Sequence, residues 1–100
     1  MQVTVARIYL TEAEKKLKRI IKLLYEEEAL RGVTVFRAIS GYGPSGHLHS
    51  SQLLDISLNL PLVVEFFDIP ERVDRVLEDL RDEIEPGHLL TWSAECNLND

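Results

Sequence analysis

An α+β fold of the ferredoxin-like type is predicted by the order of elements along the chain, which runs strand, helix, strand, strand, helix, strand. The length of 100 residues, of which 45% are apolar and 28% charged, is that of one soluble globular domain over residues 1–100. Right-handed crossovers would place the first and third strands in the middle of an antiparallel sheet. Both helices would then cover the same face of that sheet.

Consecutive patterns near the N-terminus predict the first strand and the first helix. Val3–Tyr9 is rich in β-branched residues and alternates as a strand does. Thr11 and Glu14 fit a capping box, in which each side chain accepts from the other residue's backbone N–H at a helix start. Gly32 offers the positive φ that ends a helix, which gives a length of roughly 18–20 residues. The apolar stripe of this helix is Leu17, Ile20, Ile21 and Leu24.

Apolar runs and two prolines predict the next three elements. Val33–Ile39 is predicted to be the second strand and Leu60–Phe67 the third. Pro61 suits the start of that strand, where a missing N–H harms the ladder least. Pro70 suits the first turn of the second helix, because its fixed φ is helical and its N–H would have no partner there. The buried stripe of the second helix is Val73, Val76, Leu77, Leu80 and Ile84.

The last strand is predicted over Leu89–Cys96, after Pro86-Gly87 ends the second helix. Both faces of the sheet look apolar, because the third strand does not alternate and Tyr9 and Trp92 have apolar neighbours of opposite parity. Two helices can cover only one face. We therefore expect other copies of the chain to cover the second face in a closed homo-oligomer, the alternative being an exposed apolar patch on a monomer.

Charge and composition exclude several classes of function. The net charge of −6 argues against nucleic-acid binding, which needs clustered Lys and Arg. No apolar run approaches the about 20 residues of a membrane span, and MQVTVARIYL lacks the basic start and apolar stretch of a secretory signal. Cys96, the single cysteine, cannot form an internal disulfide and favours a reducing cytoplasm. No residue pattern indicates a nucleophile or paired catalytic carboxylates, so we expect no enzymatic activity.

The connection between the second and third strands, Ser40–Ser57, is the most informative segment. Hairpin connections usually take about 2–5 residues, so one of this length is functional or disordered. It contains Gly41, Gly43 and Gly46, and glycines let the backbone approach a ligand and turn N–H groups toward an anion. A mobile surface loop is the alternative interpretation.

His47 and His49 in the same segment raise the alternative of a metal site, because imidazole is a common ligand of zinc and copper. His88 and Cys96 could join them only through the fold or a neighbouring subunit. No carboxylate cluster or CxxC motif accompanies them, so solvated or hydrogen-bonding histidines are the preferred interpretation.

Three runs give the chain a family resemblance: R-G-V-T-V-F-R-A-I-S-G-Y-G, then H-L-H-S-S, then L-P-L-V-V-E-F-F-D. In this order and spacing the sequence resembles, over nearly its whole length, the PII-like group of conserved bacterial and archaeal proteins catalogued as a domain of unknown function. More distantly it is similar to the PII nitrogen-signalling proteins. The resemblance implies a trimer of ferredoxin-like subunits that binds adenine nucleotides in the clefts between them. It also implies that the long loop engages a target protein.

Carried over by position, the resemblance assigns ligand-binding roles. Gly41, Tyr42 and Gly43 match the base of the loop, and Gly87 belongs to a turn in which His88 replaces a phosphate-binding lysine. Histidine is mostly neutral near pH 7 and is a poorer phosphate ligand than lysine. The C-terminal arginines that PII proteins use on phosphates have no counterpart here. The possible replacements are Arg7 and Arg37, expected on neighbouring central and edge strands.

These observations lead to three hypotheses. The first is a non-enzymatic signalling trimer that binds a small anion such as AMP, ADP or ATP, so that the ordered loop alters its contact with a protein target such as a membrane transporter. The second is a trimer that binds divalent metal through His47 and His49, as in the divalent-cation tolerance proteins. The third is an assembly protein with no ligand.

Overall fold

The computed structural model describes residues 1–11, 15–27, 30–41, 49–50 and 60–99. The main strands are β1 (Gln2–Thr11), β2 (Gly32–Arg37), β5 (Pro61–Asp68) and β6 (Leu89–Glu95). The helices are α1 (Leu17–Lys22), its π-helical continuation η2 (Leu23–Glu27), α2 (Pro70–Leu80) and the short 3-10 helix η3 (Arg81–Glu83).

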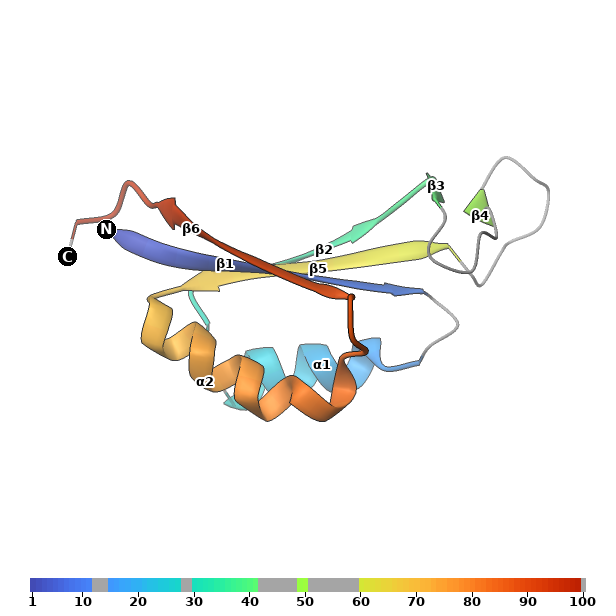
Figure 1. The fold of residues 1–100 in the computed structure, drawn as a ribbon, viewed down its shortest axis with the longest axis horizontal. Coiled ribbons are helices and arrows are strands. Elements are labelled where there is room, and N and C mark those ends of the chain that lie inside the picture. The colour runs from blue at the N-terminus through green and yellow to red at the C-terminus, as the bar shows by residue number, and fades with distance from the viewer. Residues whose placement is uncertain (12–14, 28–29, 42–48, 51–59, 100) are drawn as a thin grey trace.

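These strands form one antiparallel sheet in the order β2–β5–β1–β6, with both helices on the same face (Figure 1). The sheet order confirms the prediction that the first and third long strands lie in the middle. In the register of the sheet, Arg7 of β1 stands opposite Glu65 of β5 on one side and Leu90 of β6 on the other. The α+β architecture is the ferredoxin-like one expected from the order of elements.

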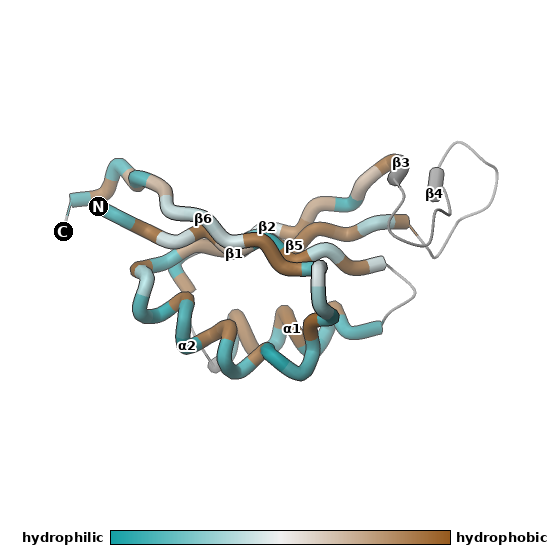
Figure 2. The backbone as a smooth tube through the Cα atoms, in the orientation of Figure 1, coloured by the Kyte–Doolittle hydropathy of each residue, from teal (hydrophilic) through white to brown (hydrophobic). Residues whose placement is uncertain are grey.

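The core lies between the sheet and the helices, where hydrophobic residues of the central strands face those of the helices (Figure 2). Each fully buried aliphatic or aromatic side chain contributes about 1.5–3 kcal/mol by leaving water. Phe66, 1% exposed, is the largest of them. Both predicted helical stripes contribute to this core, with some members only partly buried. The buried residues of this core cluster are Ala6, Ile8, Leu10, Ile20, Leu24, Leu62, Val64, Phe66, Val73, Val76 and Leu80.

The first helix begins later than the capping-box pattern predicts. Thr11 is the last residue of β1 and pairs with Pro61, so the sheet ladder takes the residue that was expected to cap the helix. The N-cap is Lys16, and its side chain makes no capping hydrogen bond. Glu14, the other half of the predicted box, lies outside the described residues. The helical segment therefore spans residues 17–27 and is shorter than predicted.

The prediction that Gly32 ends the helix with a positive φ is wrong. Gly32 is the first residue of β2, and its φ is not positive. It faces Phe67 across the β2–β5 ladder, and a Cβ built on Gly32 would lie 3.1 Å from Cε1 of that ring. Close approach of an aromatic ring, not backbone conformation, accounts for the glycine. β2 also ends earlier than predicted, at Arg37, although the Ala38 N–H still donates to the Pro61 carbonyl at 2.9 Å.

Within the long connection, the structure adds a short hairpin of β3 (Ser40–Gly41) and β4 (His49–Ser50) that was not predicted. The start of α2 agrees with the sequence, because Pro70 stands in its first turn after Ile69 as N-cap. α2 ends at Leu80 and continues as η3, so the chain leaves the helix before the predicted Pro86-Gly87 stop.

Candidate functional site

One end of the sheet collects most of the described residues to which the sequence assigns ligand binding. We call it the loop end: there β1 and β2 finish and β5 and β6 begin (Figure 1). Arg37, near the end of β2, stands opposite Leu62 of β5. His88 precedes β6, and its carbonyl accepts from the Tyr9 N–H of β1 at 2.9 Å. The β3–β4 hairpin, with Gly41 paired to His49, adjoins this end.

His88 is fixed at the loop end by two contacts to Tyr9. Besides the backbone bond, the His88 Nδ1 lies 3.1 Å from the Tyr9 carbonyl oxygen. A carbonyl can only accept, so Nδ1 carries the proton and Nε2 is left to face outward. Nε2 is 4.0 Å from Glu85 Oε2, and 30% of the side chain is exposed. The Tyr9 carbonyl therefore orients the ring, and Nε2 lies on the side near Glu85.

Gly87, next to His88, adopts a φ of 85°. This left-handed conformation disfavours side chains, so the turn requires glycine. No heavy atom of the described residues lies within 4 Å of the place where its Cβ would stand, so among them the space over the turn is open. The turn can thus be approached closely by a ligand or by a neighbouring chain.

Arg7 is not at the loop end, and the expectation that it neighbours Arg37 across adjacent strands is wrong. β5 lies between β1 and β2, so the two arginines stand on strands that are not paired. Arg7 donates to Glu65 Oε1 from Nε at 3.0 Å and from Nη2 at 2.6 Å, and its guanidinium lies 5.3 Å from the Trp92 ring centre. Hydrogen bonding to the Glu65 carboxylate raises the pKa of Arg7 above its ordinary value. The Arg7 side chain is thus held on the sheet surface by its contacts with Glu65 and Trp92.

Arg37 and His88 do not converge within one chain. They occupy opposite edges of the sheet, β2 and β6, with β5 and β1 between them. At about 4.8 Å per strand, three spacings separate them by about 14 Å. One subunit therefore holds Arg37 and His88 at separate edges of the sheet.

The rest of the predicted ligand and metal residues fall largely outside the described part of the chain. Tyr42, Gly43 and His47 are not described, and of His49 only the backbone pairing is. Among the described residues, no group of three or more His, Cys, Asp or Glu side chains could hold a metal ion.

The face of the sheet opposite the helices is apolar and carries no layer of described residues (Figure 1). We call it the outer face. At its centre is the Arg7–Glu65 ion pair, whose side chains are 37% and 28% exposed. The sequence correctly predicted that apolar residues lie on this face of the sheet as well as on the face that packs against the helices. By strand alternation its apolar members include Val5, Tyr9, Phe36, Val63, Phe67, Leu90 and Trp92.

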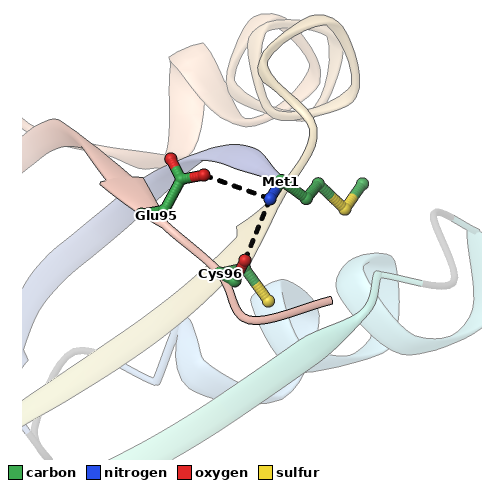
Figure 3. A network of polar contacts seen from close by, with 3 residues as sticks. All are labelled: Met1, Glu95 and Cys96. Atoms are coloured by element: carbon green, nitrogen blue, oxygen red, sulfur yellow. Dashed lines mark hydrogen bonds and ion pairs between the residues drawn. The ribbon is translucent and has the colours of Figure 1, made fainter. Parts of the chain in front are cut away.

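At the other end of the sheet, β1 starts beside the end of β6 (Figure 3). The Met1 ammonium donates to the Cys96 carbonyl at 3.0 Å and to Glu95 Oε1 at 3.2 Å, and the Cys96 N–H donates to the Met1 carbonyl at 2.8 Å. Cys96 is half-buried just beyond β6, not within it.

None of the helices described is long and apolar enough to cross a lipid bilayer.

Comparisons with known proteins place these features in context. The profile of the DUF190 family, described as uncharacterized ACR, matches residues 3–96. UPF0166 protein MJ1524 from Methanocaldococcus jannaschii is 34% identical over 99 residues, covering 94% of this chain and 89% of that protein.

Two solved structures share the fold at low identity. One is CPII, a nitrogen regulatory PII-like protein from Thiomonas intermedia K12 bound to ADP, AMP and bicarbonate. Its TM-score is 0.68 at 18% identity, over 94% of this chain and 87% of CPII. The other is the divalent ion tolerance protein CutA1 from Ehrlichia chaffeensis, with a TM-score of 0.60 at 11% identity, over 98% of this chain and 84% of CutA1.

Proposed function

Because this chain belongs to the DUF190 family and shares its fold with PII-like proteins, we propose that it is a non-enzymatic regulatory protein of the PII-like type. In this proposal it is a cytoplasmic homotrimer that binds a small anion, such as AMP, ADP or ATP, between subunits. Loop 40–57 contacts a target protein, such as a membrane transporter, and ligand binding changes that contact.

The main support for the proposal is that Arg37 and His88 lie at the same end of the sheet but on different edges. In a closed ring, the β2 edge of one copy can approach the β6 edge of the next. The two halves of the site would then face one cleft, and an anion there would contact groups from both copies.

The outer face supports self-association. Tyr9, Phe36, Leu90 and Trp92 are 36–52% exposed in the single chain. A contiguous apolar surface of this kind is unusual on a soluble monomer and marks an interaction site. The face is also charge-neutral at its centre, because the Arg7–Glu65 pair is already formed within each chain. A second copy can therefore cover it without leaving an unpaired charge.

An anion is the ligand class that fits the groups at the loop end. Arg37 is exposed on β2, and there is open space at the Gly87 turn that precedes His88. Arginine binds phosphate and carboxylate by paired hydrogen bonds. CPII supports adenine nucleotides or bicarbonate as the compounds to test first. A histidine in place of lysine predicts phosphate binding that strengthens when the ring is protonated.

The test is calorimetric titration of wild-type protein with AMP, ADP, ATP and bicarbonate, compared with two variants. His88→Asn keeps an amide that can donate to the Tyr9 carbonyl but removes the outward nitrogen, and Arg37→Gln removes the guanidinium. Both should weaken binding at least tenfold, whereas Arg75→Gln, on the exposed side of α2, should not. Absence of binding by every compound, or equal affinity of all variants, contradicts the proposal and favours an assembly protein without a ligand.

The similarity to CutA1 favours a second candidate, a trimer that binds divalent metal through His47 and His49. Metal-stripped protein titrated with zinc and copper ions should then bind one of them, and replacing both histidines by alanine should abolish that binding. The same variant should keep any nucleotide affinity. Metal binding that survives the replacement rules out these two histidines as ligands.

A further inference from the structure

A cleft lies at the end of the sheet remote from Arg37 and His88, where β5 passes into α2. Its volume is about 600 Å³, and the described residues that line it are Met1, Arg31, Asp68, Ile69 and Arg72. β5 has eight residues, so at about 3.3 Å per residue this end lies about 23 Å from the loop end. The cleft is therefore separate from the site proposed above, and nothing in that proposal depends on it.

A buried carboxylate holds the walls of this cleft together. Asp68 is 3% exposed, and its Oδ2 accepts from the Arg31 N–H at 2.9 Å while its Oδ1 accepts from the Ile69 N–H at 2.7 Å. The Arg72 Nη1 lies 3.9 Å from the same Oδ2. The start of β2 and the start of α2 are thus tied to one carboxylate. The contact from Arg31 uses its backbone, which leaves its exposed side chain outside the structural bonds of Asp68.

Among the described residues that line the cleft, positive side chains outnumber negative ones. Arg31 and Arg72 supply two guanidinium groups and Asp68 one carboxylate, and Arg72 also takes part in polar contacts within the chain. The Met1 ammonium adds no excess, because it pairs with Glu95 (Figure 3). A cationic cleft stands out on a chain whose net charge is −6. Guanidinium groups recognise carboxylate and phosphate oxygens through directed hydrogen bonds.

Arg31 also borders a second, more apolar cleft beside the β2 edge. That cleft has a volume of about 730 Å³ and is lined by Leu24, Tyr25, Glu26, Leu30, Arg31, Gly32 and Val33. Tyr25 is 79% exposed and Val33 37% exposed, so apolar surface is open to a ligand there. The shared arginine makes the two clefts neighbours, one with arginine side chains in excess and one mainly apolar apart from Glu26.

We propose that the two clefts together bind one small amphiphilic anion. Its carboxylate or phosphate contacts the guanidinium groups of Arg31 and Arg72, and its aromatic or aliphatic part lies against Leu30 and Val33 beside Tyr25. The apolar part distinguishes this ligand from a free inorganic anion, which would use only the arginine-lined cleft.

The proposal is tested by titrating ¹⁵N-labelled protein with phenyl phosphate, benzoate, inorganic phosphate and benzyl alcohol, while amide chemical shifts are followed by NMR. Phenyl phosphate or benzoate should shift the amides of Arg31, Val33 and Ile69 in a saturable way, and should bind at least tenfold more tightly than inorganic phosphate and than benzyl alcohol. The amide of His88 at the loop end serves as the internal reference for binding elsewhere.

Arg31→Gln is the decisive variant, because it keeps the backbone N–H that Asp68 accepts from and removes only the guanidinium. It should weaken binding of the aromatic anion at least tenfold with an unchanged thermal midpoint. Arg75→Gln, on the exposed side of α2, is the matched control and should bind as wild type does. Equal affinity of Arg31→Gln and wild type overturns the proposal. So does binding of inorganic phosphate as tight as that of phenyl phosphate, or shifts confined to the loop end.

Discussion

Replacing Asp68 by asparagine is expected to lower the free energy of unfolding by about 3 kcal/mol. The two carboxylate oxygens accept from two different backbone donors, the Arg31 N–H at 2.9 Å and the Ile69 N–H at 2.7 Å. Asparagine has one oxygen, so whichever way its amide turns, an NH₂ group faces one of those N–H groups. A hydrogen bond to a charged acceptor contributes about 1.5–3 kcal/mol, and a buried donor left without a partner costs about 1–3 kcal/mol.

Those ranges give the estimate of about 3 kcal/mol, with little added by the Arg72 contact, because that pair is 3.9 Å apart and Arg72 is partly exposed. Urea unfolding at one fixed protein concentration measures the change, since the stability of an oligomer depends on concentration. A loss of this size corresponds to a fall in the thermal midpoint of about 12 °C or more for a domain of this length.

Asp74→Asn is the matched control, an exposed carboxylate on α2, and should change stability by less than about 0.5 kcal/mol. A loss below about 1 kcal/mol for Asp68→Asn would refute the reasoning. It would mean that the starts of β2 and α2 are not held by the carboxylate.

Three other outcomes are expected. Arg7→Glu and Glu65→Arg should each reduce the mass measured by light scattering to that of a monomer, and the double reversal should restore the oligomer. An unchanged mass for both single variants would exclude the outer face as the contact surface. Phe66→Ala, in the core, should cost about 3–5 kcal/mol in urea unfolding, and a cost under 1 kcal/mol would place that ring outside the core. Gly87→Ala should cost about 1–2 kcal/mol because of its positive φ, although its Cβ meets nothing; an unchanged midpoint would show that the turn tolerates a side chain.

The sequence predicted those elements whose local residue preferences match the pairing and packing in the folded chain. Pro70 begins α2 as expected, because a fixed helical φ and a missing N–H suit a first turn wherever the helix packs. Thr11 failed as a cap because local capping competes with a strand ladder, and the ladder to Pro61 prevails. Gly32 was assigned to a helix end by residue type, whereas its reason is a phenyl ring 35 positions later in the sequence. Such a contact leaves no local signal.

The candidate site was predictable in its parts but not in its arrangement. The glycine–histidine turn was assigned by position through the family resemblance, and Arg37 was assigned as a replacement for arginines that the chain lacks. Their separation by two strands depends on the sheet order, and the incorrect pairing of Arg7 with Arg37 came from treating a central and an edge strand as neighbours. Asp68 gave no signal at all, since an aspartate after an apolar strand is as consistent with an exposed turn. Its 3% exposure and its two backbone donors identify it as buried and structural.

The two ends of the sheet differ in what they require from a neighbour. At the loop end, Arg37 and His88 stand about 14 Å apart on opposite edges, so a ligand that needs both requires a second copy. At the other end, Arg31 and Arg72 line one cleft within a single chain. Nucleotide affinity should therefore fall when subunits dissociate, because a ligand that binds only the assembled form is coupled to assembly by mass action. Binding at the Arg31 cleft carries no such coupling, so an Arg7→Glu monomer would lose the first function and keep the second.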